Sequence, residues 1–120
     1  MANPNIVNVA SIKGFGQSGA ITTSDVDILT VTAEEVWKIN TFMISNTDGS
    51  NACHLSVKVS TDAGSTFHEI GPAIPIPPRT VLTFIDKNNQ IYLEAGDRLR
   101  VSAGANSDLV YLVSGEQIID

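Results

Sequence analysis

The residues of this chain that could do chemistry begin with its single cysteine, Cys53, which stands next to His54. A thiol becomes a nucleophile when a nearby histidine takes its proton. Both residues lie in a stretch that alternates apolar and polar residues, and neighbouring side chains on a β-strand point to opposite faces of the sheet. The spacing therefore predicts a small buried residue at Cys53 and no catalytic pair. A single cysteine also excludes an intramolecular disulfide.

Two loops rich in oxygen ligands are the candidates for a metal site. One contains Asp62, His68 and Glu69, and the other covers residues 46–50. Neither loop matches an EF-hand, which closes on a bidentate glutamate, and the two histidines lack the HxH or HExxH spacing typical of zinc ligands. We therefore expect solvated turns, with no metal and no other cofactor.

The sharpest local motif runs from Ser60 to Phe67 and matches the Asp-box pattern Ser-x-Asp-x-Gly-x-Thr-aromatic. The Asp62 carboxylate can accept hydrogen bonds from backbone amides, Gly64 can adopt a positive φ, and Phe67 can anchor the hairpin in the core. Sialidases carry such a box on each of several propeller blades, and glycoside hydrolysis requires a pair of placed carboxylates, for which the chain offers no candidate. The motif predicts a structural hairpin, and we expect no enzyme.

Phosphate and lipid are disfavoured as ligands by pattern and by charge. Gly14, Gly16 and Gly19 fit a GxGxxG spacing, but no helix follows whose N-terminus could bind a phosphate. The formal net charge of −6, from 7 Lys and Arg against 13 Asp and Glu, repels nucleic acid and anionic membranes. Residues 1–9 lack a signal-peptide pattern. We expect no nucleic acid and no membrane as partners, and synthesis in a cytoplasm.

Short runs of Val, Ile, Leu, Thr and Phe, separated by Gly, Asn, Asp and Pro, predict the strands of an all-β fold. Residues 54–60 and 98–103 alternate apolar and polar side chains, which is typical of strands with one buried face. Residues 81–85 and 109–113 are apolar on both faces, which indicates central strands or a second face covered by a partner. The prolines between residues 72 and 78 indicate an edge strand or a connection.

The chain divides, on this interpretation, into an N-terminal arm with a glycine-rich hinge, residues 1–19, and a single sandwich domain, residues 20–120. The three glycines would loosen the backbone and let the first strand reach away. The arm, or the apolar run 110–119, could then add a strand to the sheet of a neighbouring subunit. The alternative is that the first strand packs on its own domain.

The opening residues 1–12 resemble small virion structural proteins of tailed bacteriophages, particularly those of marine and cyanobacterial hosts. The likeness extends through residues 36–40, 44–52, 91–97 and 114–118. It implies a virion component made in the host cytoplasm, preferably a capsid decoration (cement) protein that bridges capsomers and binds the major capsid protein or other virion proteins. The alternative is a subunit of a neck or tail appendage, or a receptor- or carbohydrate-binding module of the tail.

Residues 93–101 look like the late hairpin of jelly-roll trimers. This resemblance implies a jelly-roll-like antiparallel β-sandwich of about 8 strands and a homotrimer. In such an assembly the interface is expected to use apolar residues of the arm and of the two doubly apolar strands, namely Ile6, Val7, Val9, Ile12, Val81, Phe84, Leu109 and Tyr111.

Overall fold

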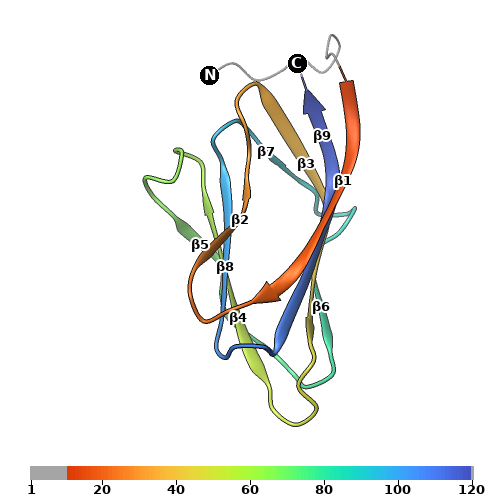
Figure 1. The fold of residues 1–120 in the computed structure, drawn as a ribbon, viewed down its shortest axis with the longest axis vertical. Coiled ribbons are helices and arrows are strands. Elements are labelled where there is room, and N and C mark those ends of the chain that lie inside the picture. The colour runs from red at the N-terminus through yellow and green to blue at the C-terminus, as the bar shows by residue number, and fades with distance from the viewer. Residues whose placement is uncertain (1–10, 120) are drawn as a thin grey trace.

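The computed structural model describes residues 11–119, and all the regular elements of these residues are β-strands (Figure 1). In chain order they are β1 (Ser11–Ile21), β2 (Val26–Thr30), β3 (Glu35–Asn46), β4 (Cys53–Ser60), β5 (His68–Ile76), β6 (Val81–Ile85), β7 (Ile91–Leu93), β8 (Arg98–Ala103) and β9 (Leu109–Ile119). No helix that could cross a bilayer occurs in residues 11–119.

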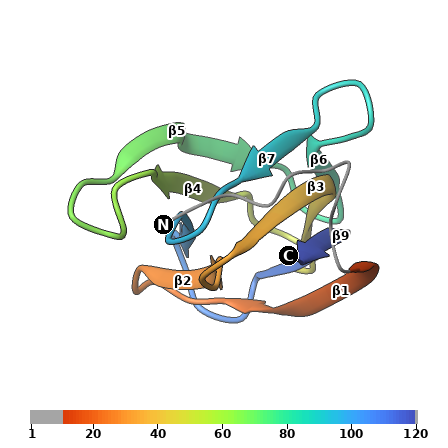
Figure 2. The same ribbon diagram turned by 90° about the horizontal axis from the view of Figure 1, so that it is seen from above.

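The strands form two antiparallel sheets that face each other, as Figure 2 shows from above. We call them sheet A, with the order β1-β9-β3-β6 and β7 also paired to β3, and sheet B, with the order β2-β8-β4-β5. Apart from β7, each sheet thus has four strands, and the chain passes repeatedly from one sheet to the other, as in a jelly roll. The predicted jelly-roll-like β-sandwich is confirmed.

The core lies between the two sheets because alternate side chains of each strand point inward. The alternation predicted for β4 and β8 is confirmed, since Leu55, Val57, Leu99 and Val101 are at most 1% exposed. Sheet A contributes Ile39, Phe42, Ile44 and Val113 from its two central strands. Cys53 is also buried, as predicted.

The hinge expected at Gly14, Gly16 and Gly19 is a strand. All three glycines belong to β1, which pairs residue by residue with β9 from Ser11 opposite Ile119 to Ile21 opposite Leu109. The composition suggested a flexible loop, but the pairing with β9 holds the backbone extended. The sandwich therefore includes residues 11–19 as well.

Candidate interaction surface

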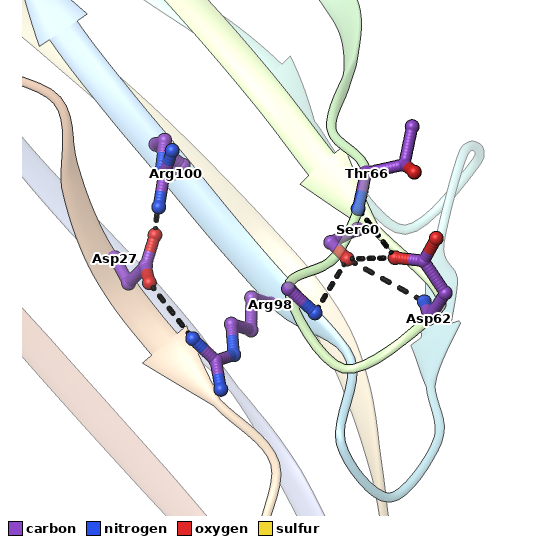
Figure 3. A network of polar contacts seen from close by, with 7 residues as sticks. Asp27, Ser60, Asp62, Thr66, Arg98 and Arg100 are labelled. Carbon is purple, nitrogen blue, oxygen red and sulfur yellow. Dashed lines mark hydrogen bonds and ion pairs between the residues drawn. The ribbon is translucent and has the colours of Figure 1, made fainter.

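The Asp-box loop between β4 and β5 is closed by its own side chains (Figure 3). Asp62 Oδ1 accepts hydrogen bonds of 2.8 Å from the Thr66 amide and 2.8 Å from Ser60 Oγ, which in turn accepts one of 2.9 Å from the Gly64 amide. The φ of Gly64 is 88°, a conformation that favours glycine. The bonds from Thr66 and Ser60 lower the pKa of Asp62. Its carboxylate therefore serves the turn.

Phe67 does not anchor this hairpin in the core. It is half-buried on the outer face of sheet B, where the guanidinium carbon of Arg100 lies 3.6 Å from the centre of its ring. Arg100 Nε donates a 2.7 Å hydrogen bond to Asp27 Oδ1, and Arg98 Nη1 lies 3.5 Å from Asp27 Oδ2. Both arginines are thus paired with the carboxylate of Asp27, as Figure 3 shows.

The other candidates for catalysis and metal binding are the Cys53–His54 pair and the second oxygen-rich loop, residues 46–50. Cys53 is buried, whereas the neighbouring His54 is exposed on the opposite face of β4. In the second oxygen-rich loop, Asp48 Oδ1 accepts hydrogen bonds from the amides of Ser50 and Asn51, and these bonds lower its pKa. Residues 11–119 contain no group of three or more His, Cys, Asp or Glu that could hold a metal ion.

The predicted interface residues separate into core and surface positions. Leu109 and Tyr111 are core residues, 0% and 7% exposed, and so they offer almost no surface to a partner. Phe84 is half-buried and packs edge-on against Phe42 in the core, with 6.0 Å between the ring centres. Ile12 and Val81 are exposed, at 51% and 56%. The predicted residues Ile6, Val7 and Val9 lie outside the described residues.

The exposed side chains of β9 belong to Val110 and Leu112, which alternate with the predicted interface residues Leu109 and Tyr111. Val110 and Leu112 are 39% and 40% exposed. Tyr111 points inward, and its hydroxyl accepts a 2.9 Å hydrogen bond from Gln17 Nε2. The strand was expected to offer Leu109 and Tyr111 to a partner, but the side chains that it offers are Val110 and Leu112.

Val110 and Leu112 belong to an apolar surface that extends across the strands of sheet A. Residues directly opposite each other in neighbouring antiparallel strands lie on the same face of the sheet. Val110 pairs with Ser45 of β3, which also pairs with Val81 of β6. Leu112 lies between Met43 of β3 and Ser18 of β1. We call this surface the apolar face, and its residues are Ser18, Met43, Ser45, Val81, Val110 and Leu112. With Tyr111 they line a shallow hollow of about 290 Å³.

The two sheets differ in what they expose. Seven large hydrophobic residues are exposed in the described chain, and five of them, Ile12, Val81, Tyr92, Val110 and Leu112, belong to strands of sheet A. The outer face of sheet B carries ion pairs instead, including Lys58 with Asp25 at 3.2 Å. Sheet B thus has a solvated outer face, and sheet A has an apolar one that no other part of residues 11–119 covers.

No protein-family model matches the sequence, and no curated protein matches it. A protein of Bacillus endospore appendages, described as disulfide-linked pili, is similar in structure with a TM-score of 0.56 at 6% identity, over 91% of this chain and 87% of its own. A pentameric capsid protein from metagenomic phage sequences gives a TM-score of 0.44 at 14% identity, over 87% of this chain and 61% of its own. The Drosophila NLP core, studied for pentamer formation and histone binding, gives 0.46 at 14% identity, over 88% and 97%.

The similarity to the pilus protein shows a shared fold and nothing beyond it. The other two TM-scores are below 0.5, and no conclusion is drawn from them.

Proposed function

We propose that this chain is a non-enzymatic structural subunit of a virion that assembles with copies of itself through the apolar face of sheet A. The observation that carries the proposal is the gathering of Met43, Val81, Val110 and Leu112 on one side of the sandwich, where no other described residue covers them. Contiguous exposed apolar surface is costly in water and marks sites of protein–protein contact.

A second copy of the chain suits this surface on electrostatic grounds. The chain carries a net charge of −6, so two copies repel each other least when they meet at surfaces without charged side chains. The apolar face has only apolar and hydroxyl side chains, whereas the outer face of sheet B carries Asp25, Asp27, Lys58 and Arg100. Contact through sheet A buries apolar surface without burying a charge.

Within this class we favour a capsid decoration (cement) protein, which is what the sequence resemblance implies. Its partners would be further copies, in a homotrimer, and the major capsid protein or other virion proteins. Residues 1–10, outside the described part of the chain, are the segment that we propose for contact with the capsid lattice. A sandwich that joins neighbouring capsomers would stabilise the shell by mass action.

Sedimentation velocity on Leu112→Glu tests the assembly. A charge at this exposed position is tolerated by the fold but must be desolvated in an interface, so we expect the dissociation constant to rise at least about thirtyfold. Thr30→Glu adds the same charge at an exposed position of sheet B and should leave assembly unchanged. A wild-type chain that stays monomeric, or an L112E oligomer as tight as the wild type, would overturn the proposal.

Imaging virions with and without the protein tests the finer assignment. A decoration protein adds density over the capsid shell, at positions between capsomers. Density confined to a vertex, neck or tail would replace decoration by the appendage alternative while leaving self-assembly intact.

A further inference from the structure

The two sheets have four edges, and three of them are protected against pairing with another chain. On sheet B, β5 contains Pro72 and Pro75, and β2 has five residues interrupted by a register shift. On sheet A, the edge opposite β1 is divided between β6, with five residues, and β7, with three. Proline, short length and irregular register are the devices by which natural proteins protect their edges.

The fourth edge, β1, has none of these devices. It extends over 11 residues and pairs with β9 without a register shift. It contains no proline, and Lys13 is its only charged residue. Figure 1 shows β1 along one rim of the molecule, and among the described residues no strand pairs with its free side.

Gly14 and Gly16 of β1 are explained neither by the conformation of this chain nor by its packing. Among the described residues, Gly64 and Gly96 are the only glycines with a positive φ, so Gly14 and Gly16 do not need to be glycine for this reason. A Cβ added at Gly16 would meet nothing within 4 Å, and one at Gly14 would meet only the Gly115 carbonyl oxygen at 3.9 Å. Glycine within a strand weakens it and often marks a bulge, a tight bend or the close approach of a ligand or another backbone. The pairing of β1 with β9 contains no bulge.

We propose that β1 pairs with β1 of a second copy, antiparallel about a twofold axis, so that the two A sheets become one continuous sheet. The inference rests on the proposed self-assembly and adds a twofold contact to it. This contact differs from those within a homotrimer, whose subunits are related by a threefold axis, and it would join two such trimers. The second copy is the occupant because β1 is also that copy's only unprotected edge among the described residues, and a twofold axis makes one strand both donor and acceptor of the pairing. An axis near Gly16 would separate the two Lys13 side chains, so the pairing brings no like charges together.

Disulfide trapping of single-cysteine additions tests this geometry in the full chain. The variants are Gly14→Cys, Gly16→Cys, Ser18→Cys and Ala20→Cys, all at exposed positions on the outer side of β1. Residues opposite each other in an antiparallel pair have Cα atoms about 4.5–5.5 Å apart, which is within disulfide range. The wild type, whose Cys53 is buried, supplies the baseline.

The proposal predicts rapid oxidation to a covalent dimer only for positions that face each other. For an axis at Gly16, G16C should cross-link with itself, and a mixture of G14C with S18C should cross-link at a similar rate. Other combinations should be at least about tenfold slower, because a shift of two residues moves the thiols beyond bonding distance. Whatever the position of the axis, the residue numbers of the fast pairs must have a constant sum.

The outcomes separate this inference from the proposed function. Slow, position-independent cross-linking in a protein that sediments as an oligomer overturns the β1 contact but leaves assembly through the apolar face standing. Fast pairs with a constant difference of residue numbers would mean parallel strands and would also overturn it. Fast pairs with a constant sum in an oligomer that L112E leaves intact would support β1 pairing and overturn the apolar face.

Discussion

Arg100 lies over the ring of Phe67, with the guanidinium carbon 3.6 Å from the ring centre. The contact joins the β4–β5 loop to β8, which lies on the other side of β4 in sheet B. The same guanidinium is held by Asp27 of β2 through a 2.7 Å hydrogen bond. One side chain thereby links three parts of sheet B on its outer surface.

Phe67→Leu should therefore loosen the loop without emptying a core site. The leucine keeps apolar contact but lacks the π-face that attracts the cation. We expect faster hydrogen exchange of the loop amides, including that of Thr66, with a small fall in melting temperature. Exchange measured by NMR checks this, and Phe84→Leu, which changes an aromatic residue packed against the core, should act on global stability instead. Equal loop protection in F67L and wild type would contradict a stapling role for Phe67.

Gly115 is required where β9 passes the bulge of β3. A Cβ at this position would collide with the backbone carbonyl oxygen of Lys38, in a buried place where neither strand can move aside. Gly115→Ala should lower the free energy of unfolding by about 3 kcal/mol. Urea denaturation measures this loss.

Gly16→Ala is the matched control for Gly115→Ala, since its Cβ would meet open space. At concentrations where the chain is dissociated, it should be neutral or stabilise the fold by about 0.5–1 kcal/mol. Similar losses in both variants would show that the close approach at Gly115 does not decide its identity.

Asn46 is buried and ties the end of β3 to the neighbouring loop and to β5. Its Nδ2 donates hydrogen bonds of 2.9 Å to the Ile76 carbonyl and 3.1 Å to the Asn51 carbonyl, and its Oδ1 accepts one of 3.0 Å from the Asp48 amide. Asn46→Ala leaves the buried Ile76 carbonyl and the part-buried Asn51 carbonyl and Asp48 amide without this partner, and it should cost about 2–3 kcal/mol.

Asn40→Ala removes a side-chain oxygen that accepts an exposed hydrogen bond from Gln90 Nε2, and it should change stability by less than about 0.5 kcal/mol. Thermal unfolding of the two variants gives the comparison. An Asn46 variant as stable as the Asn40 variant would mean that water replaces the lost bonds.

The sequence was sufficient to predict which face of a strand is buried where the other face is polar. The buried face of β4 is predicted by its alternation of apolar and polar residues, Leu55, Ser56, Val57 and Lys58, and the structure agrees. In β9, Leu109 to Val113 are apolar at both parities, so local pattern could not tell the core face from the exposed one. That choice depends on the pairing of β9 with β1 and β3, which are distant in sequence.

The two other failures have the same origin in long-range structure. Three glycines within six residues look like a loop, and only the pairing with β9 shows that they form a strand. The aromatic residue of the Asp box was expected in the core, but Arg100 offers Phe67 a partner on the surface. Arg100 lies on a strand that the motif itself does not contain.

Asp27 and Asp97 should shift the dependence of stability on pH in opposite directions. The hydrogen bond from Arg100 lowers the pKa of Asp27 in the folded protein. Asp27 therefore stabilises the fold above its unfolded pKa, near 3.8, and this stabilisation is lost as pH falls through the lower folded pKa. Burial raises the pKa of Asp97, despite a hydrogen bond that it accepts from the Glu94 amide. The stabilisation that Asp97 contributes is therefore present below pH 3.8 and is lost as pH rises through the higher folded pKa.

The asparagine variants measure both effects, because an amide does not titrate in this range. Asp27→Asn should be less stable than the wild type at pH 7 and approach it in acid, where the wild-type carboxylate is protonated as well. Asp97→Asn keeps an oxygen that can accept the Glu94 amide, and it should gain stability relative to the wild type as pH rises from acid to neutral. Urea midpoints measured from acid to neutral pH give the two difference curves, and slopes of the same sign would refute the assignment of opposite shifts.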